Sequence, residues 1–342
     1  MASVREWLEG ARIRTLSAST APVFAGTATA WFAGPITDPP FVPGQRSTAL
    51  LLLVLCLIVG LGFQIGSNFA NDYSDGMRGT DDHRIGPQRL VGSGAVAPRL
   101  VKRAAFVSFA VACLAGLLVV GMAISAASNS WEEVLANPSE LQTIVFLVLI
   151  GLACLLAAWF YTGGRKPYGY AGLGEVFVFI FFGLVATAGS SFVQSGLVCV
   201  AIDDFVCEIH RDFPWAASLI IGAVMGALAT AILVANNLRD LASDAQAGKY
   251  TLPVRLGDTR TRWFYVILIA ASILGFVAVA WLTSWFTLLS LLGLVLIIRP
   301  AIRVIQGATG RELISVLKWT GLAELACAIL LGVGLWIGWL YG

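Results

Sequence analysis

The chain has 342 residues, of which 58% are hydrophobic and only 12% are charged, and its mean hydropathy is +0.83. A soluble domain carries roughly 25% charged residues, so this composition excludes a soluble globular protein and indicates a chain that crosses a membrane many times. The formal net charge of +2 matters less than where the basic residues fall, and we expect no nucleic-acid partner.

Apolar windows long enough to cross a bilayer as a helix, roughly 20 residues each, recur nine times along the chain. They lie at residues 14–33, 48–70, 103–125, 142–161, 174–195, 215–237, 262–283, 285–303 and 318–340. The N-terminal segment lacks the layout of a cleaved signal peptide, so we expect the first span to be retained. The sequence therefore predicts an all-α, polytopic membrane protein, with residues 1–342 as a single domain.

The basic residues are distributed unevenly between the two sides of this topology. All but two of the 22 Lys and Arg residues fall in segments on one side, and only Arg46 and Arg211 fall on the other. Basic loops mark the cytoplasmic side of a membrane protein. We therefore expect a multi-pass protein of the cell (inner or plasma) membrane with a cytoplasmic N-terminus and an external C-terminus.

The end of the second span carries the first polar motif. Gln64, Asn68 and Asp72 are spaced four apart, so a continuing helix would stack them on one face. More acids and three arginines follow in a glycine-containing stretch: Asp75, Arg78, Asp81, Asp82, Arg84 and Arg89. Carboxylates at the end of a membrane helix are costly unless compensated, and a divalent cation with an anionic ligand would compensate them.

A matching motif closes the sixth span. Asn236, Asp240 and Asp244 are again spaced by four, and Lys249 follows in a glycine-containing loop. Two such helix ends facing each other could hold more than one Mg²⁺ ion and so bridge a diphosphate, with basic residues neutralising its remaining charge. The alternative interpretation is that these are solvated loop charges. We favour the metal and anion site because the two clusters match.

Other candidates are less specific. The loop from Tyr161 through Lys166 is glycine-rich and could contact phosphate, or could be a plain connection with interfacial tyrosines. Aromatic residues of the fifth span could line an apolar tail, stabilise a carbocation or merely face lipid: Phe177, Phe179, Phe181 and Phe182. Glu324 in the last span is either functional or bonded to a neighbouring helix.

The six cysteines do not form a metal-ligand pattern. Four of them lie in apolar runs, where a small buried hydrophobic residue is expected: Cys56, Cys113, Cys154 and Cys327. Cys199 and Cys207 flank a polar loop and could pair if that loop faces an oxidising compartment.

Three stretches together carry a family resemblance. They are NFANDYSDGMRGTDDHRIGPQRLVGSG (68–94), YTGGRKPYGYAGLGE (161–175) and NNLRDLASDAQAGKYTLPVRLGD (236–258). With them the chain resembles, over essentially its whole length, the UbiA superfamily of intramembrane prenyltransferases. The RIGPQRLVGSG and KPYGY stretches favour the branch that prenylates 1,4-dihydroxy-2-naphthoate in menaquinone synthesis.

The resemblance implies nine helices around a central cavity capped by cytoplasmic loops, with two Mg²⁺ ions bridging the diphosphate to both motifs. The implied metal positions are Asn68, Asp72, Asp75, Asp240 and Asp244, with Asn236 matching the second motif. The implied catalytic positions are Asp72, Asp240, Lys166 and Tyr161. The implied substrate contacts are Tyr161, Lys166 and Lys249. From the residues themselves, the further candidates for substrate binding are Gln64, Arg84, Arg89 and Asn236. Gly76 stands where many relatives carry an acid, so Asp75, Asp81 and Asp82 are alternatives for completing the first cluster.

The implied reaction transfers a polyprenyl chain from an allylic polyprenyl diphosphate to 1,4-dihydroxy-2-naphthoate, with loss of CO₂ and diphosphate, giving demethylmenaquinone. The expected partners are these two substrates and the lipid bilayer, and the site should face the cytoplasm. One alternative is a UbiA-type enzyme with another aromatic acceptor. The other is a secondary transporter, which would place its acids near the bilayer midplane.

Overall fold

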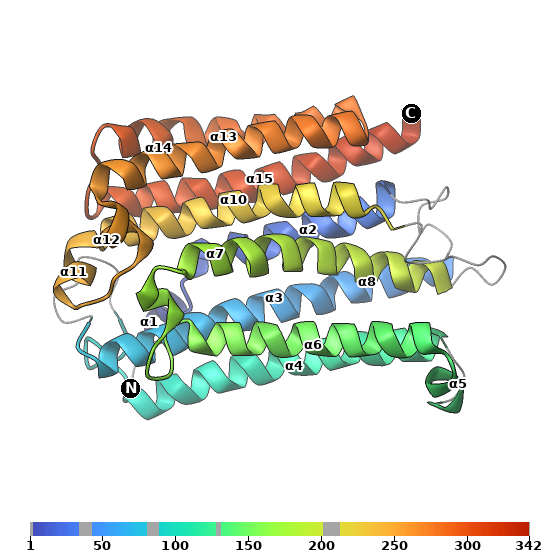
Figure 1. The fold of residues 1–342 in the computed structure, drawn as a ribbon, viewed down its shortest axis with the longest axis horizontal. Coiled ribbons are helices and arrows are strands. Elements are labelled where there is room, and N and C mark those ends of the chain that lie inside the picture. Colours follow the sequence, from blue (N-terminus) through green and yellow to red (C-terminus); the bar gives the residue numbers. More distant parts are fainter. Residues whose placement is uncertain (1–2, 34–42, 81–88, 128–130, 201–212, 342) are drawn as a thin grey trace.

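The structure, a computed structural model, describes residues 3–33, 43–80, 89–127, 131–200 and 213–341, and in these ranges its regular elements are helical (Figure 1). Eight helices in the described ranges are long and apolar enough to cross a membrane. They are Arg46–Met77, Pro98–Ile124, Glu140–Phe160, Gly174–Ser195, Trp215–Arg239, Asp258–Leu282, Trp285–Ile305 and Glu312–Tyr341. Eight of the nine predicted spans are confirmed in this sense, as expected for apolar segments whose backbone groups must bond internally in lipid.

The remaining predicted span, 14–33, corresponds to α2 (Ser17–Phe32), a helix of 16 residues. It begins later than expected because Ile13–Thr15 form a separate 3₁₀ turn before it. Although α2 is short, it is buried in the bundle, where it packs against α3, α8, α10 and α15.

The helices have the following bounds. They are α1 (Val4–Gly10), α2 (Ser17–Phe32), α3 (Pro43–Met77), α4 (Pro98–Ala127), α5 (Trp131–Ala136), α6 (Pro138–Phe160), α7 (Gly174–Val178), α8 (Ala186–Val200), α10 (Trp215–Arg239), α11 (Leu241–Gln246), α12 (Leu252–Leu256), α13 (Asp258–Leu282), α14 (Val295–Ile305) and α15 (Glu312–Tyr341). A π-helical segment, Phe179–Val185, joins α7 to α8, and 3₁₀ segments span Tyr168–Ala171 and Trp285–Leu294.

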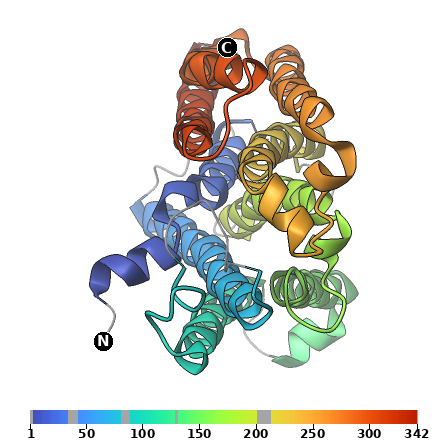
Figure 2. The ribbon, with the colours of Figure 1, turned by 90° about the vertical axis from the view of Figure 1, so that its left-hand side faces the viewer.

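The bundle has two groups of helices joined by α2. In Figure 1, α3, α4 and α6 lie on one side and α10, α13, α14 and α15 on the other. Seen end-on in Figure 2, most of the long helices run roughly parallel to one axis, with α1 projecting outward at the N-terminal end. The labelled ends of the chain lie at opposite ends of the bundle (Figure 1).

The π-helical segment lies against α10 at a contact between glycines. A Cβ added to Gly183 would lie 2.3 Å from the Cα of Gly226, so only glycine allows the two backbones to approach this closely. Wide turns of this kind occur often at functional sites. Here the segment carries Phe181, Phe182 and Val185 to the wall of a cavity.

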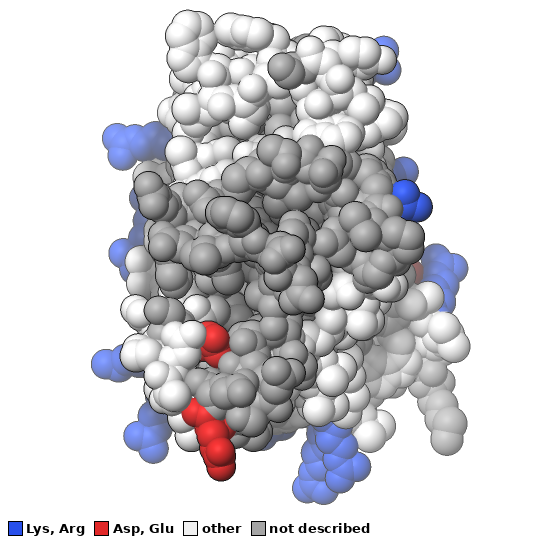
Figure 3. Space-filling model, turned by 90° about the vertical axis from the view of Figure 1, so that its right-hand side faces the viewer, with Lys and Arg blue, Asp and Glu red and all other residues white. Residues whose placement is uncertain are grey.

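The charged side chains are distributed as the loop pattern predicts. Figure 3 views the end of the bundle that carries α5 and the C-terminus. Acidic side chains lie on this face, whereas most Lys and Arg side chains in view stand at its edges. The opposite end of the bundle carries α1, α11 and the polar ends of α3 and α10 (Figure 1). The two polar motifs therefore lie at the same end.

Candidate functional site

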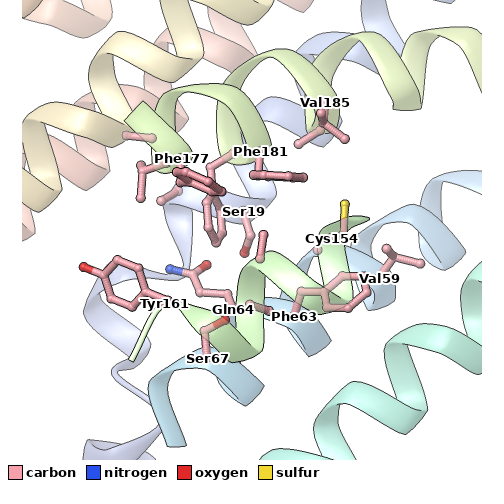
Figure 4. A pocket seen from close by; sticks show the side chains of 18 of the residues that line it. Ser19, Val59, Phe63, Gln64, Ser67, Cys154, Tyr161, Phe177, Phe181 and Val185 are labelled. Atoms are coloured by element: carbon pink, nitrogen blue, oxygen red, sulfur yellow. The ribbon is translucent and has the colours of Figure 1, made fainter. Parts of the chain in front are cut away.

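One cavity of about 510 Å³ lies between the two helix groups. Its apolar part is lined by side chains of α3, α6 and the helices from α7 to α8, and Phe63, Phe177, Phe181 and Val185 surround this space in Figure 4. At its polar end the cavity is lined by residues of both motifs: Asn68, Asn71, Asp75, Arg89, Asn236, Asp240, Asp244 and Lys249. The prediction that the two motifs form halves of one site is consistent with this arrangement.

The polar residues of α3 that line the cavity differ in part from the set that is spaced by four. An α-helix turns by about 100° per residue, so Asn71 and Asp75 lie within about 20° of Gln64 around the axis, whereas Asp72 lies about 80° away. In agreement, Asn71 and Asp75 line the cavity and Asp72 is fully buried behind it.

Asp72 holds a loop in this structure. Its Oδ2 accepts a hydrogen bond from the backbone N–H of Leu90 and its Oδ1 accepts one from Val91, both at 3.0 Å. Both carboxylate oxygens thus fix the segment that brings Arg89 to the cavity. The metal-binding role of Asp72 stays a prediction.

Gln64 and Asn68 hold the N-terminal segment against α3. Gln64 donates to the carbonyl oxygen of Thr15 (2.6 Å), and Asn68 donates to that of Ala11 (2.9 Å). Between these anchors Arg12 adopts the left-handed conformation (φ 56°), which is uncommon for a non-glycine residue and often marks a functional site. Its guanidinium donates to the Asn71 amide oxygen at 3.1 Å, in the orientation of that amide which satisfies both of its ends.

Asp75 is contacted by residues from two other parts of the chain. Its Oδ1 accepts a hydrogen bond from the Tyr170 hydroxyl at 2.5 Å, and its Oδ2 lies 3.2 Å from the Lys249 ammonium. The same ammonium lies 3.9 Å from Asp244 Oδ1. Asp75 and Asp244 come from different motifs, so Lys249 joins the two halves of the site.

The second motif bends where a continuous helix was expected. The helix α10 ends at Arg239, Asp240 caps it, and α11 begins at Leu241. The Arg239 guanidinium forms two bonds with the Asp240 carboxylate, at 2.7 and 2.6 Å, and a third with the Asn236 amide oxygen at 2.9 Å. This buried fork orients both side chains at the cavity wall.

The 161–175 loop closes the polar end of the cavity. Arg78 donates to the carbonyl oxygens of Thr162 and Gly164, both at 2.6 Å, which ties this loop to the end of α3. Tyr161 and Tyr168 line the cavity, and burial is the largest cause that raises the pKa of each phenol, so both stay protonated at neutral pH. Tyr168 stacks on Phe177 with 3.9 Å between ring centroids.

The remaining predicted site residues are placed as follows. Tyr161, Arg89 and Lys249 line the cavity, whereas Lys166 is exposed and is not among the lining residues. Arg84 lies outside the described residues, as do Asp81 and Asp82. The cysteine pair is also untested, because residue 207 and the side chain of residue 199 are not described.

Two further predictions concern the spans themselves. Phe177, Phe181 and Phe182 line the cavity, whereas Phe179 packs partly buried against the hydrophobic core. Glu324 is fully buried in α15 and lines no described cavity, and neither of its carboxylate oxygens has a hydrogen-bond partner in the described part of the chain.

Sequence reasoning missed several site residues, and each contacts a predicted residue or, in the case of Arg12, another missed one: Arg12, Asn71, Tyr170, Arg239 and Asn237. Asn237 shows the pattern, because its amide donates to Glu175 Oε1 at 2.9 Å and lies beside Asn236 in the cavity wall. The helical angles around α3 would have identified Asn71. The others depend on contacts between distant segments.

The donor set fits a metal that keeps part of its coordination for other ligands. Within the described residues no three acids, histidines or cysteines gather closely enough to form a metal centre alone. Mg²⁺ is usually bound through one or two carboxylates, with water and substrate phosphates completing its shell. Asp75 and Asp244, which already share the Lys249 ammonium, provide such a pair.

Long apolar helices that enclose an apolar cavity, with carboxylates, amides and cations at one end, define an integral membrane protein whose cavity suits a long apolar molecule with an anionic head. The model of the UbiA prenyltransferase family matches residues 19–322. The chain belongs to this family.

Relatives and solved structures agree with this membership. The chain is 41% identical to a 1,4-dihydroxy-2-naphthoate octaprenyltransferase of Mycobacterium leprae, covering 96% of this chain and 95% of that one. It is 34% identical to the protein of the same name from Haemophilus influenzae, covering 98% and 97%. A UbiA homologue from Aeropyrum pernix has the same fold (TM-score 0.62, 18% identity, 95% and 98% covered), as does one from Archaeoglobus fulgidus bound to GPP and Mg²⁺ (0.54, 13%, 95% and 99%).

Proposed function

We propose that the chain transfers a polyprenyl group from an allylic polyprenyl diphosphate to 1,4-dihydroxy-2-naphthoate. The single observation that carries this proposal is that the polar ends of α3 and α10 line one end of an apolar cavity, where Lys249 joins them. The relatives named for this reaction support the choice of acceptor.

The polar end would receive the diphosphate. Arg12, Arg89 and Lys249 line it and supply charge-assisted hydrogen bonds to phosphate oxygens. Asp75, Asp240 and Asp244, with the amides of the two motifs, would hold Mg²⁺. The family resemblance implies two ions. When bound, the metal neutralises the charge that develops on the departing diphosphate.

The apolar part of the cavity would hold the isoprenoid tail and keep water from the allylic centre. The bond between the allylic carbon and the diphosphate oxygen breaks, and its electron pair leaves with diphosphate. The ring carbon that bears the carboxylate forms the new carbon–carbon bond. Loss of CO₂ then returns an electron pair to the ring, so the product is the reduced, quinol form of demethylmenaquinone.

The aromatic row beside the polar end suits a cationic, flat reaction centre. Tyr168, Phe177 and Phe181 follow one another as stacked rings, with centroid distances of 3.9 and 5.9 Å. Their π faces attract positive charge and can lie against a planar acceptor. The polar groups gather at one end of the bundle, which disfavours the transporter alternative, since that class places its sites near the midplane.

The test uses membranes that contain the chain, farnesyl diphosphate or a longer allylic diphosphate, Mg²⁺ and 1,4-dihydroxy-2-naphthoate. We expect a prenylated, decarboxylated product by mass spectrometry, loss of turnover on chelation, and recovery when Mg²⁺ is restored. Absence of product, or transfer only to 4-hydroxybenzoate, would contradict the proposal. Asp75→Ala and Asp244→Ala should each remove turnover while the protein stays folded.

The proposed placement is the cell membrane with the site towards the cytoplasm. It rests on the basic residues that gather at the end of the bundle with the two motifs. In a variant whose native cysteines are replaced, an impermeant thiol reagent applied to intact cells should label a cysteine added at the C-terminus and not one added at the N-terminus. The opposite labelling pattern would contradict the proposed orientation.

A further inference from the structure

Besides the Asn71 amide of its own helix, which lies 3.3 Å from Oδ2, two donors of different character hold the Asp75 carboxylate. Its Oδ1 takes the neutral Tyr170 hydroxyl at 2.5 Å, and its Oδ2 faces the charged Lys249 ammonium at 3.2 Å. The side chains of Asp75 and Lys249 are 2% and 12% exposed, so water screens this pair little.

The position of Lys249 is built into the local fold. Gly248 takes a positive φ of 71°, and the next backbone N–H, that of Lys249, returns to the carbonyl oxygen of Asp244 at 2.8 Å. This turn brings the ammonium within 3.9 Å of Asp244 Oδ1 and within 5.1 Å of the centre of the Tyr170 ring. The ammonium thus lies between acids that belong to different motifs.

Two buried carboxylates that face one position repel each other unless a cation lies between them. Lysine can occupy such a position and also leave it, because its charge sits on a flexible stem of four carbons. A tyrosine hydroxyl cannot take that role, because it brings no positive charge. Its hydroxyl donates to Asp75 Oδ1 at 2.5 Å, so it can orient the carboxylate without neutralising it.

We propose, resting on the proposed function, that Lys249 is a resident cation that competes with Mg²⁺ for Asp75 and Asp244. The metal then binds tightly only together with a diphosphate, which draws the ammonium away as a phosphate contact. Tyr170 is the positioning residue that keeps the Asp75 carboxylate oriented in both states. Metal ions without substrate are held weakly, so the two ligands bind interdependently.

The experiment measures protein-bound Mn²⁺ by equilibrium dialysis of the full chain in detergent, first with Mn²⁺ alone and then with inorganic diphosphate at equal concentration on both sides. Wild type should bind Mn²⁺ weakly alone and at least tenfold more tightly with diphosphate. Lys249→Met should bind Mn²⁺ alone at least tenfold more tightly than wild type. Tyr170→Phe should bind it about tenfold more weakly, as expected when the partner of a metal ligand is removed.

Lys102→Met is the matched control, because it removes the same charge from α4, where the ammonium lies 5.5 Å from the Tyr73 ring and outside the cavity lining. Its Mn²⁺ affinity should equal that of wild type. If Lys249→Met is poorly folded by thermal unfolding, Lys249→Gln should show the same increase in affinity, and Lys249→Arg should not.

An unchanged or weaker Mn²⁺ affinity in the folded Lys249→Met or Lys249→Gln protein would overturn the competition. Equal effects of Lys249→Met and Tyr170→Phe, in the same direction, would overturn the division of roles. These results do not depend on turnover. Failure of wild type to prenylate the naphthoate would instead refute the proposed function.

Discussion

The Asp72 carboxylate accepts a hydrogen bond from the backbone N–H of Leu90 at 3.0 Å. This bond attaches the segment that begins at residue 89 to the end of α3. The second oxygen accepts the next N–H, that of Val91, which leaves the loop fixed at two consecutive peptide groups. An acid that resembles a metal ligand by its spacing is therefore also a support for the cavity wall.

Replacing Asp72 by Ala should destabilise this loop as well as lower activity. Hydrogen bonds to a charged group contribute about 1.5–3 kcal/mol each, so we expect a loss of about 3 kcal/mol or more in local stability. Limited proteolysis of residues 89–96 and thermal unfolding in detergent measure this loss. Asp75→Asn is the control, because it should lower activity and leave proteolysis of the loop unchanged. Equal proteolysis of Asp72→Ala and wild type would show that the two hydrogen bonds do not hold the loop.

Substitution of Arg239 should strongly destabilise the protein, although Arg239 is not one of the predicted motif positions. Its fork binds both oxygens of Asp240 in a buried setting. Removing one partner of a buried charge pair is strongly destabilising, by about 3–5 kcal/mol. Arg239→Met should therefore unfold at a lower temperature than Arg239→Lys, which keeps the charge and loses the fork.

The matched variant for Arg239 neutralises the carboxylate too. Arg239→Met combined with Asp240→Asn should recover much of the lost unfolding temperature while staying inactive. Thermal unfolding in detergent and the prenyl-transfer assay separate the two effects. If the double variant were no more stable than Arg239→Met, the charge of the Asp240 carboxylate would not be the cause of the loss.

Tyr170 should make the stability of the folded protein fall as the pH rises in the alkaline range. Burial is the first cause that raises the pKa of Tyr170 above its ordinary value of 10. The folded state therefore binds this proton more tightly than the unfolded state. The resulting stability is fully present below pH 10 and is lost as the pH rises towards the folded pKa. Unfolding temperatures measured from pH 8 to 11 should fall less steeply in Tyr170→Phe than in wild type; parallel curves would contradict the shift.

Much of the fold was predictable because lipid leaves few choices. Apolar windows of about 20 residues become helices, and the basic loops mark the helix ends that lie on one side of the membrane. The exception, α2, is short because the 3₁₀ turn at Ile13–Thr15 takes the residues that hydropathy assigned to the span. The hydropathy pattern does not show that turn, because the turn lies where the Gln64 side chain of α3 donates to the Thr15 carbonyl oxygen.

The candidate site was predictable to the level of its two halves. Spacing by four selects residues that drift around a helix by about 40° at each step, which is why Asp72 turns away from the cavity and Asp75 faces it. Tyr170 and Arg12 could not be found in this way. Each reaches the site through a contact with a distant segment, Asp75 for one and Asn71 for the other.

The glycines of the bundle divide into two kinds, and substitution should separate them. At Gly183 a Cβ would lie 2.3 Å from the Cα of Gly226, whereas at Gly151 and Gly189, which line the cavity, it would meet nothing within 4 Å. Gly183→Ala should therefore lower the unfolding temperature. Gly151→Ala and Gly189→Ala should not, because alanine also favours the helix by roughly 0.5–1 kcal/mol.

Larger side chains at the two roomy positions should act on substrate length. Leucine at Gly189 would extend into the apolar cavity, one helical turn before Phe192, whose ring contacts Phe146 across the cavity with 6.1 Å between centroids. We expect Gly189→Leu to reduce kcat/KM for a long polyprenyl diphosphate at least tenfold more than for geranyl diphosphate. Gly121→Leu is the control, because Gly121 also has open space around it and does not line the cavity. Equal losses for long and short donors in Gly189→Leu would mean that the tail does not pass this level of the cavity.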